Sequence, residues 1–522
     1  MKRSALVATA LVAGLLGAML VLLGYLAFLA SVEEVYLHGW QELVGWRSLP
    51  ALLAPVVAVQ AAWRHEPHRF GRQLAMLGVG ALSGALVGGA LGALLASHPS
   101  GPWAGGLMGA GAGTLLGMLP MVVPTSWLQA VPALALVLVV SACRPSPDPA
   151  PSRVVSQPLQ DSSGVESVVF FLGDPGEALM ESHPVLPRLR RDVEAWARHL
   201  GGDGSVRVAL LGDLVYPDGM GPPGSEGRAT DSLRLASQIA LVEGPEALAH
   251  DARALFLPGN HDWGQEEGHR GEERLQNIED FLGSWSGPAR GRVGLVPDAG
   301  RGGPVVVDLG DELRLVILDT AWWLLGREPS ETESMLRSVR RALESAGSRR
   351  VVVAAHHPLE SGGPHGAGVD LGSLFGIRWL LKKAGILLQD LDSRPYSGLK
   401  TGLLEVFREA GRPALFIGGH EHSLQVFEGG ISSAARAVVV GSGSKLTGLS
   451  AVSGMLFGRS EPGYAVLVSR ENGDLQLILK SAPDRFLRCP EDGRETCMQQ
   501  GDAAFRTVWS ETLPDREATR VR

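Results

Sequence analysis

The sequence has few cysteines, few aromatic residues and no excess of basic charge. Three cysteines in 522 residues cannot form the framework of a disulfide-stabilised scaffold. Lys and Arg number 47 against 55 Asp and Glu, and no basic tract indicates binding to nucleic acid. With 45% hydrophobic residues and glycine in no regular period, the chain is neither disordered nor collagen-like. Its length suits two or three domains.

Charge is nearly missing from residues 1–143, which contain six basic and four acidic side chains. The rest therefore holds 41 of the 47 basic and 51 of the 55 acidic residues, a net charge of −10. The stretches 4–32, 48–63 and 73–143 carry no charge, and a helix that crosses a bilayer needs about 20 apolar residues. We predict that residues 1–143 form an all-α, multi-span membrane domain of five helices, with four as the alternative.

Glycine recurs at every fourth residue in two of these expected helices, at Gly80, Gly84, Gly88 and Gly92 and at Gly105, Gly109, Gly113 and Gly117. This spacing lets two helix backbones approach closely in lipid. It predicts a tightly packed hairpin within one chain, with a pore or an oligomerisation seam as the alternative.

The orientation of the membrane domain follows from basic residues in its short loops. Lys2 and Arg3, and a second group at 64–72, place these loops in the cytoplasm, so five spans leave everything after Cys143 outside. Residues 140–143, Val-Ser-Ala-Cys, also resemble a bacterial lipobox, and lipidation at Cys143 would give the same location. We expect a multi-pass protein of a bacterial inner membrane whose following domain faces the periplasm or exterior.

After a Pro/Ser-rich linker at 144–163, the pattern at 164–488 changes to short apolar runs separated by amphipathic stretches, which predicts a mixed α/β domain. The expected strands are Ser167–Leu172, Val206–Leu211, Ala254–Leu257, Leu313–Leu318, Arg350–Ala355, Ala414–Ile417, Ala437–Val440, Tyr464–Val468 and Leu475–Leu479. The expected helices are Pro187–Leu200, Ser232–Leu248 and Glu331–Ser345, the last with a capping box of Ser330 and Glu333. Asn472-Gly473 predicts a hairpin between the last two strands.

Residues 489–522 are expected to form a C-terminal tail. It holds Cys489 and Cys497, the only cysteines after Cys143. In an oxidising compartment the two could close a small loop, and two free thiols are the alternative.

Five of the expected strands run directly into turns that carry Asp, Asn or His. The turns are Gly173-Asp174-Pro175-Gly176, Gly212-Asp213-Leu214-Val215-Tyr216, Gly259-Asn260-His261-Asp262, His356-His357-Pro358 and Gly418-Gly419-His420-Glu421-His422. Ligands bind at the carboxyl ends of strands in α/β sheets, and glycine lets the backbone bend close to a site. Carboxylate, amide, phenolate and imidazole groups without cysteine suit iron, zinc or manganese. Seven candidate ligands exceed the need of one ion, so a shared carboxylate and two ions are expected.

Together these motifs resemble those of the calcineurin-like metallophosphoesterases, and within them the purple acid phosphatase (tartrate-resistant acid phosphatase) branch. The wider superfamily begins with Asp-x-His, whereas this chain has Gly176 at the third position and a tyrosine, Tyr216, in the second motif, as the purple branch has. The resemblance covers about 167–440 and implies a four-layer αββα sandwich. It says nothing about the membrane domain.

The resemblance also implies the role of each site residue. Asp213 would bridge two metal ions. Asp174, Tyr216 and His422 would complete the first, expected to be ferric iron, and Asn260, His356 and His420 the second, which would be Fe, Zn or Mn. His357 is left out, because the family has no ligand at that position. His261 and His365 are expected to be catalytic residues on the substrate side.

The implied reaction is hydrolysis of a phosphate ester by a metal-bound hydroxide, with His261 or His365 assisting the leaving group. An acid-phosphatase-like phosphomonoesterase acting on a phosphorylated small molecule or protein is the first expectation. Phosphodiester or pyrophosphate hydrolysis on the same site is the alternative. A membrane transport or interaction module with a degenerate phosphatase domain is a rival of another class, against which the complete ligand set argues.

Overall fold

The computed structural model describes residues 163–201, 205–264, 269–366, 391, 393–429 and 434–513. All of them belong to one compact unit that covers 146–370 and 378–522. The predicted membrane domain at 1–143, its glycine series and nearly all of the 144–163 linker lie outside the described residues. Within the described ranges, no helix is both long and apolar enough to span a bilayer.

The described residues form two seven-stranded sheets, and the first combines parallel and antiparallel strands. Its order is β14 (Arg506–Thr512), β13 (Leu475–Ser481), β12 (Gly463–Arg470), β1 (Val165–Leu172), β2 (Ser205–Leu210), β3 (Arg253–Phe256) and β4 (Val293–Leu295). The strands β1 to β4 are parallel to one another. The strands β12, β13 and β14 continue the sheet in antiparallel pairs on the other side of β1.

The second sheet has a parallel centre with antiparallel strands on both sides. Its order is β11 (Met455–Arg459), β9 (Leu424–Glu428), β10 (Arg436–Val440), β8 (Leu415–Gly418), β7 (Arg350–Ala354), β6 (Leu313–Ile317) and β5 (Val305–Leu309). The strands β6, β7, β8 and β10 run parallel. The carboxyl ends of the parallel strands of each sheet therefore lie along a common edge.

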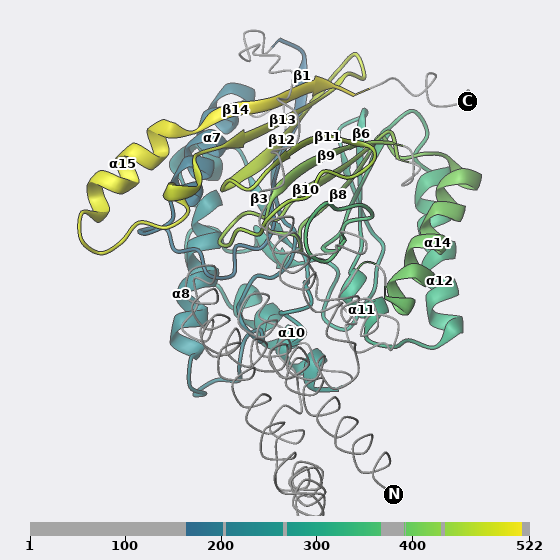
Figure 1. The fold of residues 1–522 in the computed structure, drawn as a ribbon, viewed down its shortest axis with the longest axis horizontal. Helices are drawn as coiled ribbons and strands as arrows, with labels where there is room; N and C mark the ends of the chain where they lie inside the picture. The colour runs from purple at the N-terminus through teal and green to yellow at the C-terminus, as the bar shows by residue number, and fades with distance from the viewer. Residues whose placement is uncertain are drawn as a thin grey trace, which may run out of the picture. The chain divides into compact units, whose positions relative to one another are not determined.

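The two sheets pack face to face, and helices cover their outer faces. Alternate residues of β1 show this arrangement: Val169 and Phe171 belong to the core shared by both sheets, whereas Val168 and Phe170 belong to the core that contains the helices. The helices α7 (Val185–Leu200) and α8 (Arg228–Ile239) lie on one side of the sheets, and α12 (Pro329–Glu344) and α14 (Arg394–Ala410) on the other (Figure 1). The expected α/β fold is confirmed, with its strands and helices in four layers.

All nine predicted strands are confirmed, with ends shifted by two residues at most. The expected hairpin forms too, because β12 and β13 pair antiparallel around Gly473. The predicted helix Ser232–Leu248 is instead divided into α8, a 3-10 turn and α9 (Pro245–Ala249), since Gly244 is extended and cannot continue a helix. The predicted helix Glu331–Ser345 is α12, which begins two residues earlier, at Pro329. Its capping box therefore consists of Glu328 and Glu331 rather than Ser330 and Glu333.

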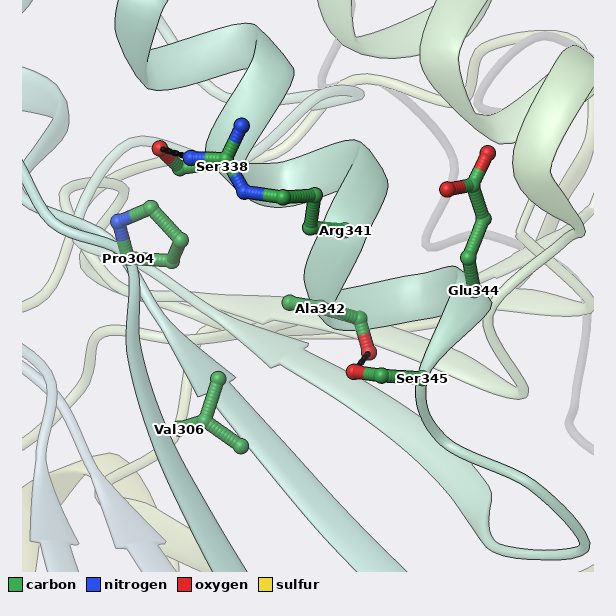
Figure 2. A pocket seen from close by; sticks show the side chains of 7 residues that line it. All are labelled: Pro304, Val306, Ser338, Arg341, Ala342, Glu344 and Ser345. Atoms are coloured by element: carbon green, nitrogen blue, oxygen red, sulfur yellow. Dashed lines mark hydrogen bonds between the residues drawn. The ribbon is translucent and has the colours of Figure 1, made fainter.

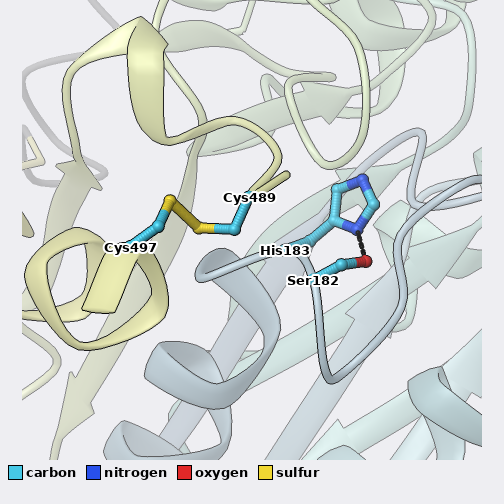
Figure 3. The surroundings of a disulfide bond; sticks show 4 residues. All are labelled: Ser182, His183, Cys489 and Cys497. Carbon is cyan, nitrogen blue, oxygen red and sulfur yellow. Dashed lines mark hydrogen bonds between the residues drawn. A yellow bond between two sulfur atoms is a disulfide. The ribbon is translucent and has the colours of Figure 1, made fainter. Parts of the chain in front are cut away.

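Residues 489–513 are part of the domain and do not form a separate tail, and the rest of the predicted tail, 514–522, lies outside the described residues. The helix α15 (Arg494–Ala504) leads into β14, which adds an edge strand to β13. Cys489 and Cys497 form a disulfide (Figure 3). The backbone N–H of Cys489 donates to the carbonyl oxygen of Ser182 at 2.7 Å. Of the two alternatives for these cysteines, the structure has the closed loop.

Candidate metal centre

The five polar turns that the sequence singles out converge at the carboxyl ends of β1, β2, β3, β7 and β8. Three non-glycine residues in these turns have a positive φ: Asp174 at 59°, Asp213 at 54° and His420 at 67°. This left-handed conformation is unfavourable for residues with a Cβ atom and is often found at functional sites. Buried hydrogen bonds hold it; for example, the backbone N–H of His420 donates to Asp174 Oδ2 at 2.8 Å.

Asp174, Tyr216 and His422 form the first group of candidate ligands. Tyr216 Oη lies 3.1 Å from both Asp174 Oδ1 and His422 Nε2, and His422 Nε2 lies 3.5 Å from Asp174 Oδ1. Gly176 leaves the space that Tyr216 needs, since a Cβ atom at 176 would lie 2.7 Å from Cδ2 of the tyrosine ring. The absence of a histidine at 176 and the presence of Tyr216 are therefore linked by packing.

Asn260, His356 and His420 form the second group. Asn260 Oδ1 lies 2.9 Å from His356 Nε2 and 3.1 Å from His420 Nδ1. His356 Nδ1–H donates to the carbonyl oxygen of Leu211 at 2.8 Å, which orients the ring and turns Nε2 toward the group. All three side chains are almost fully buried.

Asp213 lies between the two groups. Its Oδ1 is 3.3 Å from His356 Nε2 and accepts the backbone N–H of His261 at 3.0 Å. Asp174, Asp213 and His356 offer ligand atoms that all lie within 4.8 Å of one another, so Asp213 reaches toward both groups. The close approach requires glycine at 259, where a Cβ atom would meet Asp213 Oδ1 at 2.2 Å.

The donor set fits bound cations. The hydrogen bond of His356 Nδ1 to Leu211 turns Nε2 toward Asn260 Oδ1 and Asp213 Oδ1, both of which are acceptors. Acceptor atoms that face one another repel, and a shared cation converts this repulsion into attraction. The Nδ2 atom of Asn260 is buried and has no hydrogen-bond partner among the described residues. Carboxylate, phenol, amide and imidazole donors suit Fe, Zn or Mn.

Burial sets the protonation of the site. It lowers the pKa of His420 well below its usual value, and burial together with Lys445 lowers the pKa of His422 to about 4. Both rings are therefore neutral near pH 7 and can donate a lone pair. Burial raises the pKa of Asp174 well above its usual value. Burial would also raise the pKa of Asp213. The nearby His356 and His261 have a larger, opposite effect, so the pKa of the Asp213 carboxyl is lowered.

The two expected catalytic histidines lie beside the ligand groups. His261 Nδ1–H donates to the carbonyl oxygen of Pro217, which leaves Nε2 at 3.8 Å from Asp213 Oδ2. The His365 ring centre lies 4.5 Å from that of His420. The backbone N–H of His365 donates to Glu421 Oε1 at 2.8 Å, so the residue between the two histidines of the last motif holds the loop of His365.

Several residues that matter to the site were not predicted. Asp262 accepts backbone N–H groups from Leu214, Val215 and Gly259, and so ties the second motif to the third. The sequence signal that could have identified Asp262 was its position at the end of the Gly-Asn-His-Asp motif. Lys445, after β10, places its ammonium 3.5 Å from the centre of the Tyr216 ring. No sequence pattern indicated that contact, because it joins turns after strands of different sheets.

A surface pocket lies elsewhere in the domain, between β5 and α12. Figure 2 shows the side chains that line it, and its volume is about 680 Å³. Its lining consists of Pro304, Val306, Ser338, Arg341, Ala342, Glu344 and Ser345. None of the predicted site residues lines it, so it has no part in the candidate metal centre.

Comparison with known proteins gives matches among solved structures alone. No protein-family model matches the chain, and no curated protein matches its sequence. The chain is similar to GAP50, the anchor in the inner membrane complex of Plasmodium, with 15% identity and a TM-score of 0.43 over 68% of this chain and 93% of that one. It is also similar to the purple acid phosphatase PPD1 from seeds of yellow lupin (Lupinus luteus), with 16% identity and a TM-score of 0.42. That match covers 69% of this chain and 56% of the lupin protein.

Proposed function

We propose that this domain is a metal-dependent phosphoesterase with two metal ions at the site. The observation that carries the proposal is the division of seven donors, all buried except the partly exposed His422, into two groups of three with the Asp213 carboxylate between them. Paired ions of this kind serve the displacement of phosphoryl groups. The phenol of Tyr216 favours ferric iron in the first group, and the second would hold Fe, Zn or Mn.

The bound ions would supply Lewis acidity toward the phosphate oxygens and activate a water molecule. The residues of the chain hold the substrate and move protons. His261 is fixed by its hydrogen bond to Pro217, and its Nε2 faces the ligand groups, where it can protonate the leaving oxygen. His365 lies next to His420 and can contact a phosphate oxygen from that side.

The first substrate class that we propose is a phosphomonoester of a small molecule or a protein. An assay of the purified full-length chain with monoester, diester, pyrophosphate and nucleotide substrates tests the proposal, before and after removal of metal by a chelator. Hydrolysis that disappears with the metal and returns with Fe, Zn or Mn supports it. Faster cleavage of diesters or pyrophosphate would favour the alternative substrates. A chain that binds no metal and hydrolyses nothing would instead favour the transport or interaction module.

The expected membrane anchor also belongs to this proposal. We infer that residues 1–143 anchor the domain in a bacterial inner membrane, with the catalytic domain in the periplasm or exterior. The disulfide between Cys489 and Cys497 supports an oxidising compartment. Reporter fusions at Pro158 test the topology: a reporter active outside supports it, and one active only in the cytoplasm contradicts it.

A further inference from the structure

His357, which sequence reasoning excluded from the site, has an imidazole nitrogen without a partner. It follows His356 directly after β7, and both side chains are fully buried. Its Nε2 atom has no hydrogen-bond partner among the described residues. Leaving a buried polar atom unpaired is costly, so such an atom in a folded protein calls for an explanation.

The ring of His357 lies beside the second ligand group. His356, His357 and His420 offer ligand atoms that all lie within 4.8 Å of one another. The centre of the His357 ring is 4.8 Å from that of His356 and 4.4 Å from that of His420. Three imidazoles at these distances match the separation of ligands around a single ion.

The other nitrogen of His357 is held as it is in metal-binding histidines. His357 Nδ1 lies 2.8 Å from Thr320 Oγ1, and Thr320 Oγ1 also accepts the backbone N–H of His357 at 3.1 Å. Thr320 is the first residue of α11 (Thr320–Leu324), which fixes its position. When Nδ1–H of a neutral His357 donates to this hydroxyl, Nε2 keeps its lone pair. His356 Nδ1 is held in a similar way by the carbonyl oxygen of Leu211.

We propose that His357 is an additional ligand of the ion held by Asn260, His356 and His420, and that Thr320 is the residue that positions it. The inference rests on the proposed function, because it concerns the same metal centre. With His357, the second ion would have four side-chain ligands besides the bridging Asp213, and three of them would be imidazoles. The first ion would have one imidazole ligand. Borderline ions such as Zn²⁺ favour imidazole donors.

Titration of the metal-free, full-length chain with Zn²⁺ alone tests the inference. We compare the wild type with His357→Phe, which keeps a ring but removes the nitrogen, and with Thr320→Val, which keeps the shape but removes the hydroxyl. We expect two bound ions in the wild type. One of them should bind about tenfold or more weakly in His357→Phe, and about 10–100-fold more weakly in Thr320→Val. His183→Phe is the matched control, because His183 is a buried histidine near the disulfide, and its affinities should equal those of the wild type.

The outcomes separate the two proposals. A wild-type chain that binds no Zn²⁺ would contradict the proposed function itself. Two ions bound with unchanged affinities in both site variants would overturn the role of His357 alone. If His357 and Thr320 contributed only to packing, both variants would have a lower thermal stability without metal, and their affinities for the two Zn²⁺ ions would equal those of the wild type. If His357→Phe does not fold, as judged by circular dichroism, Thr320→Val decides the question.

Discussion

Tyr216 Oη lies 3.1 Å from Nε2 of His422, although 206 residues separate them in the sequence. Tyr216 comes from the turn after β2 in the first sheet, and His422 from the turn after β8 in the second. One ligand group therefore contains side chains from both sheets. The site can form only when the two sheets pack against each other, which would couple the proposed metal binding to the tertiary fold.

Asp213→Ala should abolish both metal binding and hydrolysis. Its carboxylate lies between the two ligand groups, so its loss would remove a ligand from both of the proposed ions. Metal content measured by elemental analysis and phosphatase activity should fall together. Asp280→Ala, an exposed aspartate on α10 (His269–Gly283), is the control and should keep both. A variant at 213 that retains two ions would disprove the bridging role.

His261→Ala should keep the metal but lower the rate of hydrolysis by about 10²–10⁴-fold. Its Nε2 faces Asp213 at 3.8 Å without completing either ligand group, so we expect proton transfer rather than metal binding to be lost. Metal content and kcat are measured on the same preparation. Equal loss of metal from this variant and from Asp213→Ala would show that the assignment of His261 is wrong.

Tyr216→Phe should remove a visible charge-transfer absorption from the purified chain. A phenolate bound to ferric iron gives a purple to pink colour, and the hydroxyl is the only group that this change deletes. The ring should stay packed against Gly176 and beneath Lys445, so circular dichroism should match the wild type. A colourless wild type that is fully active and contains no iron would rule out iron and the likeness to the purple branch.

Replacement of Cys489 and Cys497 by serine should lower the free energy of unfolding by about 2–3 kcal/mol, the entropic value for a cross-link between residues eight positions apart. The disulfide lies where the chain enters α15 and β14, so the edge strand should open first. Denaturant unfolding measures the loss. The wild type under reductant should match the double variant, and no difference between oxidised and reduced wild type would contradict the expectation.

Stability should fall as the pH falls from about 6.5 to about 4, in part because of His183. Burial, aided by Arg488, lowers the pKa of His183 to about 4, so over this range the unfolded chain binds a proton that the folded chain does not. His183→Gln should therefore show a shallower loss of stability than the wild type between pH 7 and pH 4. Denaturation midpoints across this range provide the measurement. Parallel curves for the two proteins would mean that His183 does not contribute.

The sequence alone determined the strands that carry the site and the turns that follow them. Runs such as Ala414–Ile417 are apolar throughout because both faces of their strands are buried, and a Gly-Asp or Gly-Asn turn at the end of a strand is a local pattern. The sequence did not reveal β4, β5, β9, β11 and β14. Four of them, β4, β5, β11 and β14, are edge strands, where partial exposure weakens the apolar pattern. The fifth, β9, is buried at four of its five residues, but the polar Gln425 interrupts its apolar run.

The tertiary structure decided which donors face each other and which residues support them. The unpaired Nε2 of His357 and the contact of Lys445 with Tyr216 depend on turns from different strands meeting at one place. The same holds for the disulfide, because the pairing of Cys489 with Cys497 depends on the course of the chain into α15. Local patterns specify which residues end a strand. Only the packing of the two sheets brings those ends within bonding distance of one another.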